Sequence, residues 1–571
     1  MYVDIVPNRS SPPAILLRES WRAEGKIKKR TIANISHWPM DQVLALRRVL
    51  KGETLIPVDE ALVTERAVSH GHVEAVLGTL RGLDLENLLT SRRSRERDLV
   101  VAMIVEQILH HDSKLADTRL WHTTTLAEEL GVEDADENDL YDALDWLLAR
   151  QENIQKKLAK RHLHEGCSAF YDVTSSYYEG RTCPLAKRGH SRDKKEGKPI
   201  IVYGTLCERG GRPISVDVYP GNTGDSSTVT DQVQRLTEGI GLQQVVLVGD
   251  RGMITQVQIE ELSEYPGLGW ITALRSGAIG KLLQKGTLQP SLFDKRNLAE
   301  ISSVEYPGER LVACYNPILA EERKRTRREL LEATELELSK IKRDVQRRTK
   351  KLLEKKEIAL KVGKVLNKYK VAKHFELTIE DSLLEWSRRE EKIKKEEQLD
   401  GIYVVRTSEP AERLSAEDAV RQYKNLSVVE AVYRAVKGLD ILIRPIRHRT
   451  EDHVRAHIFL CMLAYYVEWH MKKALAPLLF VDEELERVRW SRDPVAKAEP
   501  SESAKRKKML LRNEDGFPVH SFKTLLVELG TRQRVYYRLN EGGPETTFAQ
   551  LTVPTRFQRK AFDLLGLGCT Q

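Results

Sequence analysis

Three acidic residues stand in surroundings where they could share divalent cations. Asp172 falls within a run of apolar and β-branched residues, and a carboxylate buried there needs a cation beside it. Asp250 follows a short, almost wholly apolar run and precedes Arg251 and a glycine, while Glu430 falls in a segment with helical periodicity. Three such carboxylates can hold two divalent ions for phosphoryl-transfer chemistry, although each acid alone also fits an ordinary structural role.

The segment around Glu430 is expected to form a helix with one strongly polar face. Tyr423 lies seven residues before Glu430, Arg434 four after it and Lys437 seven after it. At about 100° per residue, these side chains fall within a band of roughly 40°. Such a stripe can hold a metal ion with its acid and bind phosphates with its cations. The alternative is a surface salt-bridge ladder, because Glu430 and Arg434 are an i,i+4 pair.

Asp172 and Asp250 need a sheet to bring them together, and the surrounding segments predict one. Residues 209–212 (Arg-Gly-Gly-Arg) mark a tight hairpin, and residues 226–237 suit a helix. Three antiparallel strands, a helix and then buried strands make up the ribonuclease H-like order. We therefore predict an α/β fold with a mixed five-stranded sheet and flanking helices. The predicted strands cover residues 166–174, 200–207, 213–219, 243–249 and 268–274.

A highly charged segment with almost no glycine or proline separates Asp250 from Glu430. It predicts a long helix or helical hairpin, partly like a coiled coil. Its basic run over residues 340–373 could follow DNA, and ordinary exposed helix charge explains that run equally well. A coiled-coil scaffold is a further alternative, but it leaves the acids unexplained. Within residues 320–397, the apolar positions at heptad-like spacing are Leu331, Leu338, Ile341, Val345 and Leu352.

Composition and pattern divide the chain into six segments. A basic strip at residues 18–30 could face DNA or only solvent. Residues 123–148 resemble a helix-turn-helix in outline, but the acidic second helix favours plain packing. Helices are expected at 416–437 and 452–476, and a strand at 401–407. The segments are a small β module (1–40), a helical N-terminal region expected to bind DNA (41–165), the first portion of the ribonuclease H-like core (166–280), a charged helical insertion (281–400), the second portion of the core, which carries Glu430 (401–480), and a C-terminal tail module (481–571).

Composition permits nucleic-acid binding without requiring it. The 571 residues carry a formal charge of +8, and 41% are hydrophobic, which is enough for a sizeable core. The six cysteines form no C-x-x-C pair, which argues against a structural zinc site and is typical of a reduced, cytosolic protein. The sequence shows no signal peptide and no uncharged apolar run of about 20 residues. We therefore expect a cytoplasmic protein.

The helix face around Glu430 resembles the signature of a known enzyme family. The DDE transposases of insertion-sequence family four and its relatives carry Tyr-x2-Arg-x3-Glu-x6-Lys. Tyr423, Glu430 and Lys437 stand in register with that signature. Leu426 occupies the arginine position of the signature. Either Lys424 or Arg434 would therefore have to make the phosphate contact of that arginine.

Other segments are similar to motifs of the same family and occur in the same order. The last two of them match a long-chain subgroup of the insertion-sequence family four superfamily. The roughly 180 residues between Asp250 and Glu430 also fit a family that places an insertion domain there. The matching segments are residues 189–193 (Gly-His-Ser-Arg-Asp), 212–225, 250–253 (Asp-Arg-Gly-Met), 444–448 and 456–461.

This resemblance implies a transposase that cleaves DNA at the ends of an insertion sequence and joins them to target DNA. It also implies a prokaryotic host, in whose cytoplasm the protein associates with the nucleoid through DNA. It implies that Asp172, Asp250 and Glu430 are the catalytic acids and hold two Mg²⁺ ions, for which Mn²⁺ should substitute. Because two ends must be paired, a homodimer on the terminal inverted repeats is expected. The implied DNA contacts are Tyr423, Lys424, Arg434, Lys437, Arg192 and Arg251.

Two other functions share some of this pattern. A ribonuclease H-like nuclease that only hydrolyses DNA would use the same acids, and a strand-transfer assay separates it from a transposase. A catalytically inactive DNA-binding relic or repressor would be favoured by the loss of an acid, and all three acids are present.

Overall fold

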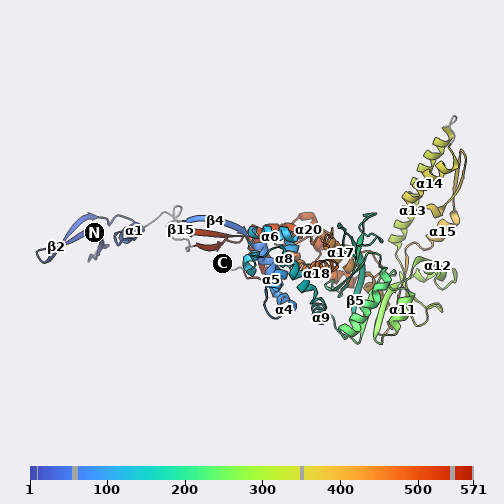
Figure 1. The fold of residues 1–571 in the computed structure, drawn as a ribbon, viewed down its shortest axis with the longest axis horizontal. Coiled ribbons are helices and arrows are strands. Elements are labelled where there is room, and N and C mark those ends of the chain that lie inside the picture. Colours follow the sequence, from blue (N-terminus) through green and yellow to red (C-terminus); the bar gives the residue numbers. More distant parts are fainter. Residues whose placement is uncertain (10, 54–61, 348–352, 540–546, 569–571) are drawn as a thin grey trace. The chain divides into compact units, whose positions relative to one another are not determined.

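The computed structural model describes the chain except for residues 10, 54–61, 348–352, 540–546 and 569–571 (Figure 1). The described residues form two compact units that combine strands and helices, so the protein is mixed α/β. The three candidate acids all belong to the second unit. The first unit comprises residues 1–69 and 532–553, and the second comprises residues 70–531 with the segment that follows residue 553.

The first unit opens with a three-stranded antiparallel sheet. Helix α1 packs on this sheet through Val43, which lies in one apolar cluster with Val3 and Ile15. Strand β3 is exposed over almost its whole length and carries much of the basic strip. The β structure predicted for residues 1–40 is therefore present. The elements are β1 (Tyr2–Val6), β2 (Ala14–Ala23), β3 (Lys26–Asn34) and α1 (Met40–Leu50).

A second sheet in this unit contradicts the prediction for the start of residues 41–165. Strand β4 (Leu62–Ser69) pairs with β15 (Gln533–Leu539), which also pairs with β16 (Thr547–Leu551). The helical N-terminal region was therefore predicted too long, because a strand precedes the helices that begin at Gly71. The prediction failed because the partner of β4 comes from the far end of the chain, and a local pattern does not show such a pairing.

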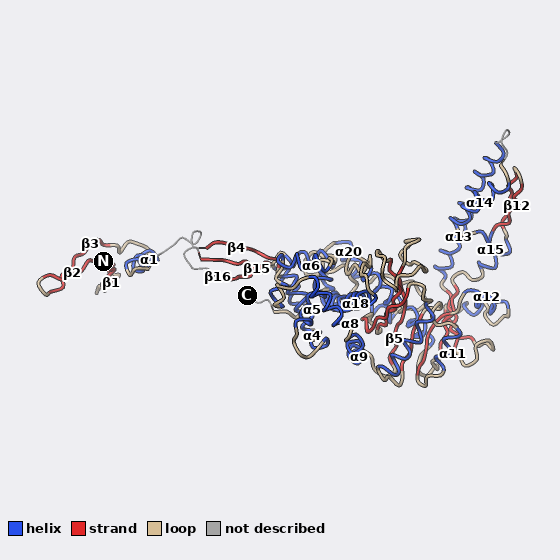
Figure 2. Tube along the Cα trace, viewed as in Figure 1, coloured by secondary structure: helices blue, strands red, loops and turns tan. Residues whose placement is uncertain are grey.

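A helical region begins the second unit. Helices α5 and α8 pack against each other and against α18 (Figure 2). Helix α7 ends at Gly131, whose φ is 69°, and α8 buries Leu140 and Leu144. These helices therefore pack into the core, as the packing interpretation of this segment expects. The helices are α3 (Gly71–Gly82), α4 (Leu85–Leu89), α5 (Arg95–Leu109), α6 (Lys114–Leu120), α7 (Leu126–Leu130), α8 (Glu137–Leu148), α9 (Gln151–His162) and α18 (Glu451–Ala474).

Eight strands form the central sheet, in the order β10-β11-β14-β9-β8-β5-β6-β7. Strands β5, β8 and β9 run parallel, and all other neighbours are antiparallel. The five predicted strands are confirmed, but a sheet of five was too small, because β10, β11 and β14 extend it. The strands are β5 (Cys167–Tyr177), β6 (Ile200–Cys207), β7 (Pro213–Pro220), β8 (Val245–Gly249), β9 (Leu268–Ala273), β10 (Leu298–Ile301), β11 (Arg310–Tyr315) and β14 (Ile402–Thr407).

Helices cover both faces of this sheet because its central strands are apolar on both sides. Phe170 and Val248 lie in one core with α17 and α18, whereas Tyr171 and Leu247 lie in a second core with α9, α10 and α11. The segment predicted as one helix at 226–237 contains a shorter α-helix, α10, which a 3-10 turn precedes and a π-helical turn follows. The covering helices not yet given are α10 (Val229–Gln234), α11 (Gln256–Ser263) and α17 (Ser427–Lys437).

The segment between β9 and β14 contains a helical hairpin. Leu338 and Val345 of α13 pack against Ile358 of α14, and the two helices lie side by side (Figure 2). The predicted helical hairpin is confirmed, whereas Leu352 lies outside the described residues. A largely helical insertion was partly wrong, because four strands also form there. The elements beyond β10 and β11 are α12 (Ser276–Gln284), α13 (Pro317–Arg347), α14 (Lys355–Tyr369), β12 (Phe375–Glu380), β13 (Leu383–Arg388) and α15 (Glu390–Glu397).

The single helix predicted at 416–437 is two helices, α16 (Ala416–Lys424) and α17. Asn425 separates them, and its side-chain amide donates to the backbone carbonyl of Arg209 (2.8 Å). That tertiary contact, at a residue with low helix propensity, favours a break which periodicity does not reveal. Among the described helices, none is long and apolar enough to cross a bilayer. The last helices are α19 (Leu485–Ser491), α20 (Glu502–Leu510), α21 (Phe522–Gly530) and α22 (Arg556–Leu564).

Glu468 of α18 gives the core a pH-dependent stability. It is fully buried, and its ion pair with Lys472 (2.5 Å) is shared with Asp440, which lies 2.6 Å from the same amine. Burial raises the pKa of Glu468 from 4.5 to about 7, although Lys472 opposes the rise. Between these pH values the native state holds a proton that the unfolded state has lost. The contribution of Glu468 to stability therefore falls as pH rises through this window.

We expect the Glu468→Gln variant, whose side chain cannot ionise, to have a larger free energy of unfolding than the wild type at pH 8. The gain should be on the order of 3 kcal/mol at most and should shrink towards pH 4.5. Urea unfolding at both pH values measures it, with the exposed Glu486 changed to Gln as the control. A Glu468→Gln protein that is destabilised equally at both pH values would contradict the buried-charge explanation.

Candidate active site

Asp172 and Asp250 lie beside each other at the ends of the paired stretch of two neighbouring parallel strands. Strands β5 and β8 pair in register up to Tyr171 and Gly249, and the two acids are the next residues on each side. Asp250 is exposed because β8 ends at Gly249, whereas Asp172 is partly buried within β5, which continues beside β6. Neighbouring strands lie about 4.8 Å apart. The fold therefore brings two of the three predicted acids to one place.

The carboxylate of Asp172 is in an electrostatically unfavourable environment. Burial raises the pKa of Asp172 to about 6, and the nearby carboxylates of Asp250 and Asp225 add to the rise. The backbone N–H of Val173, which donates to Asp172 Oδ1 (2.8 Å), and the guanidinium of Arg192 oppose it. Arg192 pairs directly with Asp225 (2.5 Å). A cation between Asp172 and Asp250 would remove much of this penalty.

The hydroxyl of Tyr433 fixes α17 to β5. It donates to the backbone carbonyl of Asp172 and accepts from the backbone N–H of Thr205 (3.1 Å). Thr205 is the residue of β6 that pairs with Asp172. The ring of Tyr433 also packs edge-on against Tyr203 at a centroid distance of 6.0 Å. These contacts set the position of α17 along the strand that carries Asp172.

Glu430 lies on α17 one helical turn before Tyr433, and it is exposed. Tyr423, near the end of α16, donates its hydroxyl to Asp250 Oδ1 (3.2 Å). Burial raises the pKa of Tyr423 above its usual range, and the carboxylates of Asp250 and Glu430 contribute to the rise. Tyr423 therefore lies close to acids that come from opposite sides of the insertion.

The three acids do not yet form a closed metal site. Among the described residues, no three His, Cys, Asp or Glu side chains are grouped so that they could hold one metal ion. Asp172 and Asp250 offer neighbouring oxygen ligands of the kind that Mg²⁺ prefers, and their mutual repulsion favours a cation. Glu430 is exposed on the adjacent helix, so its side chain can change rotamer. The two aspartates therefore fit a divalent ion, and the side chain of Glu430 would have to turn to join them.

Lys437 and Arg434, the cations of the predicted polar stripe, have different surroundings. Lys437 Nζ donates to the backbone carbonyl of Ser175 (2.5 Å) and to Asp193 Oδ1 (3.1 Å), and the side chain is only 10% exposed. Burial lowers the pKa of Lys437, although Asp193 opposes the shift. Arg434 is exposed, and in the described part of the chain it forms no ion pair with Glu430. The alternative of a salt-bridge ladder is therefore wrong for this helix.

The structure does not gather all the predicted DNA contacts at the acids. Lys424 Nζ donates to the backbone carbonyl of Val495 (3.0 Å) and lies over the ring of Tyr403. Burial lowers the pKa of Lys424. Arg251 is exposed and directly follows Asp250. Two other predicted cations do lie at the acids: Arg251 is the next residue after Asp250, and the guanidinium of Arg192 interacts electrostatically with Asp172.

Two residues that hold the site together were not predicted. Asp193, whose side chain is 2% exposed, forms ion pairs with Lys437 and Arg444 and accepts from the backbone N–H of Tyr177 (3.0 Å). Asp193 lies in the motif at 189–193, so its segment was found but not its role. Tyr433 has no such signal, because a tyrosine on the apolar side of a helix is typical of an ordinary core residue.

Comparison with known families decides which family this arrangement belongs to. Residues 170–467, more than half of the chain, match the model of the transposase DDE domain, and they include all three acids. The chain is a DDE transposase. Residues 3–56 of the transposase match the model of the N-terminal domain of IS1634 family transposases. The transposase therefore acts on DNA, and DDE transposases generally use divalent metal ions.

Other comparisons add little to this identification. No curated protein matches the transposase. Among solved structures, the piggyBac transposase in a cryo-EM synaptic complex with hairpin DNA is similar, with a TM-score of 0.33 and 10% sequence identity. The similarity covers 70% of this chain and 72% of that chain. Its TM-score is too low to support any statement about the transposase.

We expect Tyr433→Phe to destabilise the transposase and to slow DNA cleavage. The change leaves the buried Asp172 carbonyl and Thr205 amide without this partner, which should lower the free energy of unfolding by about 1–3 kcal/mol. Cleavage should slow because α17 loses its fixed position on β5. Urea unfolding and a cleavage assay, run where the variant is folded, measure the two effects.

Tyr203→Phe is the matched control for Tyr433. Its buried hydroxyl bonds to Ser176 Oγ (3.0 Å) and not to the backbone at Asp172. This variant should lose a similar amount of stability but cleave DNA at the wild-type rate. If both variants cleave equally well, Tyr433 has no positioning role.

We expect Lys437→Ala to act on stability and Arg434→Ala on DNA binding. Loss of the buried Lys437 leaves Asp193 with one cation fewer, which should cost roughly 3 kcal/mol of unfolding free energy. The exposed Arg434 should change stability by less than about 0.5 kcal/mol and lower the salt dependence of DNA binding by about one phosphate contact. Unfolding and salt-titrated binding of both variants test this. A stable Lys437→Ala protein with weaker, less salt-dependent binding would instead assign Lys437 to phosphate.

Proposed function

We propose that the transposase cleaves DNA at the ends of an insertion sequence and transfers the resulting 3′-hydroxyls into target DNA. Asp172, Asp250 and Glu430 are the proposed ligands of two Mg²⁺ ions, with Mn²⁺ as a substitute. Bound ions activate the attacking water or 3′-hydroxyl and stabilise the leaving oxygen. The observation that supports this best is the Tyr423–Asp250 hydrogen bond, because it ties the α16–α17 segment to the strand pair of the two aspartates.

Strand order and motif spacing support a finer classification. The order β7-β6-β5-β8-β9, with three antiparallel strands followed by parallel ones and helices on both faces, supports a ribonuclease H-like core. The spacing of Tyr423, Glu430 and Lys437 supports the insertion-sequence family four superfamily, and the motifs at 444–448 and 456–461 support its long-chain subgroup. In this proposal, the added strands β14, β11 and β10 extend the edge of that core.

The chain's own side chains position the acids and the DNA. Tyr423 holds Asp250 in place through its hydroxyl, and Tyr433 holds the backbone of Asp172. We assign phosphate contacts first to Arg251 and Arg434, which are exposed beside Asp250 and Glu430. Arg192, Lys424 and Lys437 remain proposed DNA contacts. Each of them would have to exchange its present partner for a phosphate.

DNA binding outside the active site is proposed for two regions. The helical region up to residue 165 remains one of them. The start of α8 is less suitable because it is acidic: Asp134 precedes the helix, Asp139 lies in its first turn, and Arg95 pairs with both. The exposed basic strip at 18–30 is the other, since a two-stranded ribbon fits the major groove. Since two inverted repeats must be held together, we propose a homodimer on DNA.

We expect Asp172→Asn, Asp250→Asn and Glu430→Gln each to lower DNA cleavage by at least about 10³-fold, while DNA binding is retained. The test uses duplex DNA that carries the inverted repeats found beside the coding sequence, with Mg²⁺, Mn²⁺ or EDTA. EDTA should abolish cleavage, and either metal ion should restore it. An acid whose replacement leaves cleavage near normal would not be a metal ligand.

Glu261→Gln is the control for these variants. Glu261 lies on α11, on the opposite face of the sheet from α17, and accepts from the Thr230 hydroxyl (2.8 Å). It should cleave and bind DNA as the wild type does. The same assay separates the alternatives: joined products support a transposase, nicked products alone support a nuclease, and binding without cleavage supports an inactive relic.

A further inference from the structure

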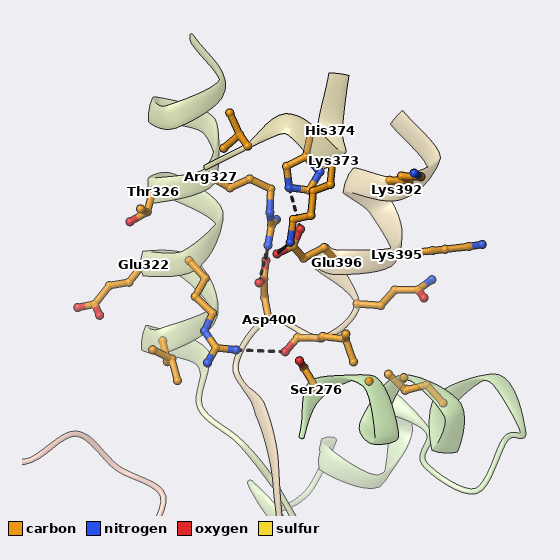
Figure 3. Close-up of a pocket in the computed structure, with 18 of the residues that line it drawn as sticks. Ser276, Glu322, Thr326, Arg327, Lys373, His374, Lys392, Lys395, Glu396 and Asp400 are labelled. Atoms are coloured by element: carbon orange, nitrogen blue, oxygen red, sulfur yellow. Dashed lines mark hydrogen bonds and ion pairs between the residues drawn. The ribbon is translucent and has the colours of Figure 1, made fainter. Parts of the chain in front are cut away.

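A large cavity opens between the insertion helices and α12. It has a volume of about 1280 Å³, and α12, α13 and α15 contribute most of its lining (Figure 3). Two of its walls are braced by a buried ion pair, in which Arg327 of α13 contacts both carboxylate oxygens of Asp400 (2.6 and 2.8 Å). Asp400 follows α15, so this pair holds α13 against the end of α15. The cavity is therefore a preformed feature of the fold.

The lining of this cavity has a large surplus of positive charge. Eight of the lining side chains are Lys or Arg, and three are Asp or Glu. All three acids already have cationic partners: Glu322 pairs with Lys497 (3.0 Å), Glu396 with Lys373 (2.9 Å) and Asp400 with Arg327. The ion pairs at Glu396 and Asp400 are visible as dashed lines in Figure 3. The remaining cations therefore have no acid in the cavity to neutralise them.

Lys281, Lys370, Lys392 and Lys395 make up most of this surplus. All four are exposed, and in the described part of the chain none of them forms an ion pair. They come from separate elements, since Lys281 belongs to α12, Lys370 follows α14 and the other two belong to α15. Cations that come from separate elements around a cavity of this size fit a polyanion better than a single phosphate, which would need them to converge on one point.

The start of α12 adds backbone donors to the same cavity. Its N-cap residue, Arg275, provides no side-chain cap, and Ser276 and Gly277 line the cavity. The first N–H groups of a helix have no partner within it, and they attract anions. A Cβ atom added at Gly277 or Gly280 would meet nothing within 4 Å, so the space beside this helix end is open.

Arg251 connects the cavity with the proposed active site. It lines the cavity, and it is the residue that directly follows Asp250. One end of the basic cavity therefore begins next to the aspartate pair. A DNA strand whose scissile phosphate lies at Asp172 and Asp250 could extend from there into the cavity without a gap in positive charge.

We propose that this cavity, here called the insertion groove, binds the sugar-phosphate backbone of the DNA on one side of the scissile phosphate. The proposal rests on the proposed active site, because Arg251 and Asp250 fix where the groove begins. In this proposal the insertion binds the DNA strand that is cleaved. Contacts of this kind are electrostatic and independent of base sequence, so they add affinity and position the strand without reading it.

The test is a triple variant, Lys281→Ala, Lys392→Ala and Lys395→Ala, in the full-length protein. Binding to duplex DNA with the element end and its flank is measured over a range of salt concentrations without divalent metal. We expect the salt-dependence slope to fall by about 2–3, which corresponds to one lost phosphate contact per lysine, and the affinity to fall tenfold or more. The matched control replaces Lys324, Lys394 and Lys508 by Ala. These are exposed lysines of α13, α15 and α20 that do not line the groove and lie outside the basic run at 340–373.

Truncated duplexes show where the groove acts. One duplex lacks DNA beyond the scissile phosphate on the flank side, and another lacks it on the element side. The difference between the triple variant and the wild type should disappear on one of these duplexes and persist on the other. Equal slopes for the groove and control variants, or an equal difference on both duplexes, would overturn the proposal.

The design separates this proposal from the proposed active site. Binding is measured without metal, so it does not depend on cleavage. Wild-type protein that binds as expected but never cleaves would refute the assigned acids and leave the groove. Wild-type cleavage together with an unchanged slope in the triple variant would refute the groove and leave the acids.

Discussion

The position of one buried hydroxyl group determines whether the acids of this transposase can meet. Tyr433 bridges the backbone of Asp172 on β5 and Thr205 on β6, and it is the firmest polar contact between α17 and the sheet near the acids. Glu430 lies one turn away on the same helix and has no comparable anchor of its own. The position of the third acid therefore depends on a residue that takes no part in the chemistry.

A second anchor lies at the C-terminal end of α17. The buried carboxylate of Asp193 forms ion pairs with Lys437 of α17 and with Arg444 of the following loop. Tyr433 and Lys437 are four residues apart, so the two anchors lie one turn apart on the face that meets β5. Two contacts at different points along a helix fix both its position and its direction. One contact alone would leave the helix free to pivot.

The chain has to return to the sheet after the 128 residues that separate β9 from β14, and the sheet itself provides that return. Strand β11 leads into α13, and β14 follows α15, yet β11 and β14 pair with each other in the central sheet. The helical hairpin is thus held at both ends by neighbouring strands. Since β14 also pairs with β9, the chain re-enters the core close to the strand from which it left. This closure explains why a long insertion does not separate Glu430 from the aspartates.

How much could be predicted from the sequence depended on whether the deciding contact was local. Strands such as β6 and β8 were predicted because apolar runs reveal burial on both faces. Strand β4 was missed, and the break at Asn425 was missed, because a distant partner decides each of them. The burial of Lys437 was missed for the same reason, because its partner Asp193 lies far earlier in the chain. Spacing placed it on the correct helix face but could not show that this end of the face is buried.

The electrostatics of the aspartate pair follow from the same geometry. Burial and the nearby carboxylate of Asp250 destabilise the ionised form of Asp172, so the pKa of its carboxyl rises to about 6. A bound proton or metal ion removes this destabilisation. Near neutral pH the proton is mostly lost, which leaves the cation as the remaining means of relief. Arg192 could have filled that role, but Asp225 holds its guanidinium. The fold thus keeps the nearest internal cation occupied and leaves the two carboxylates to an ion from solution.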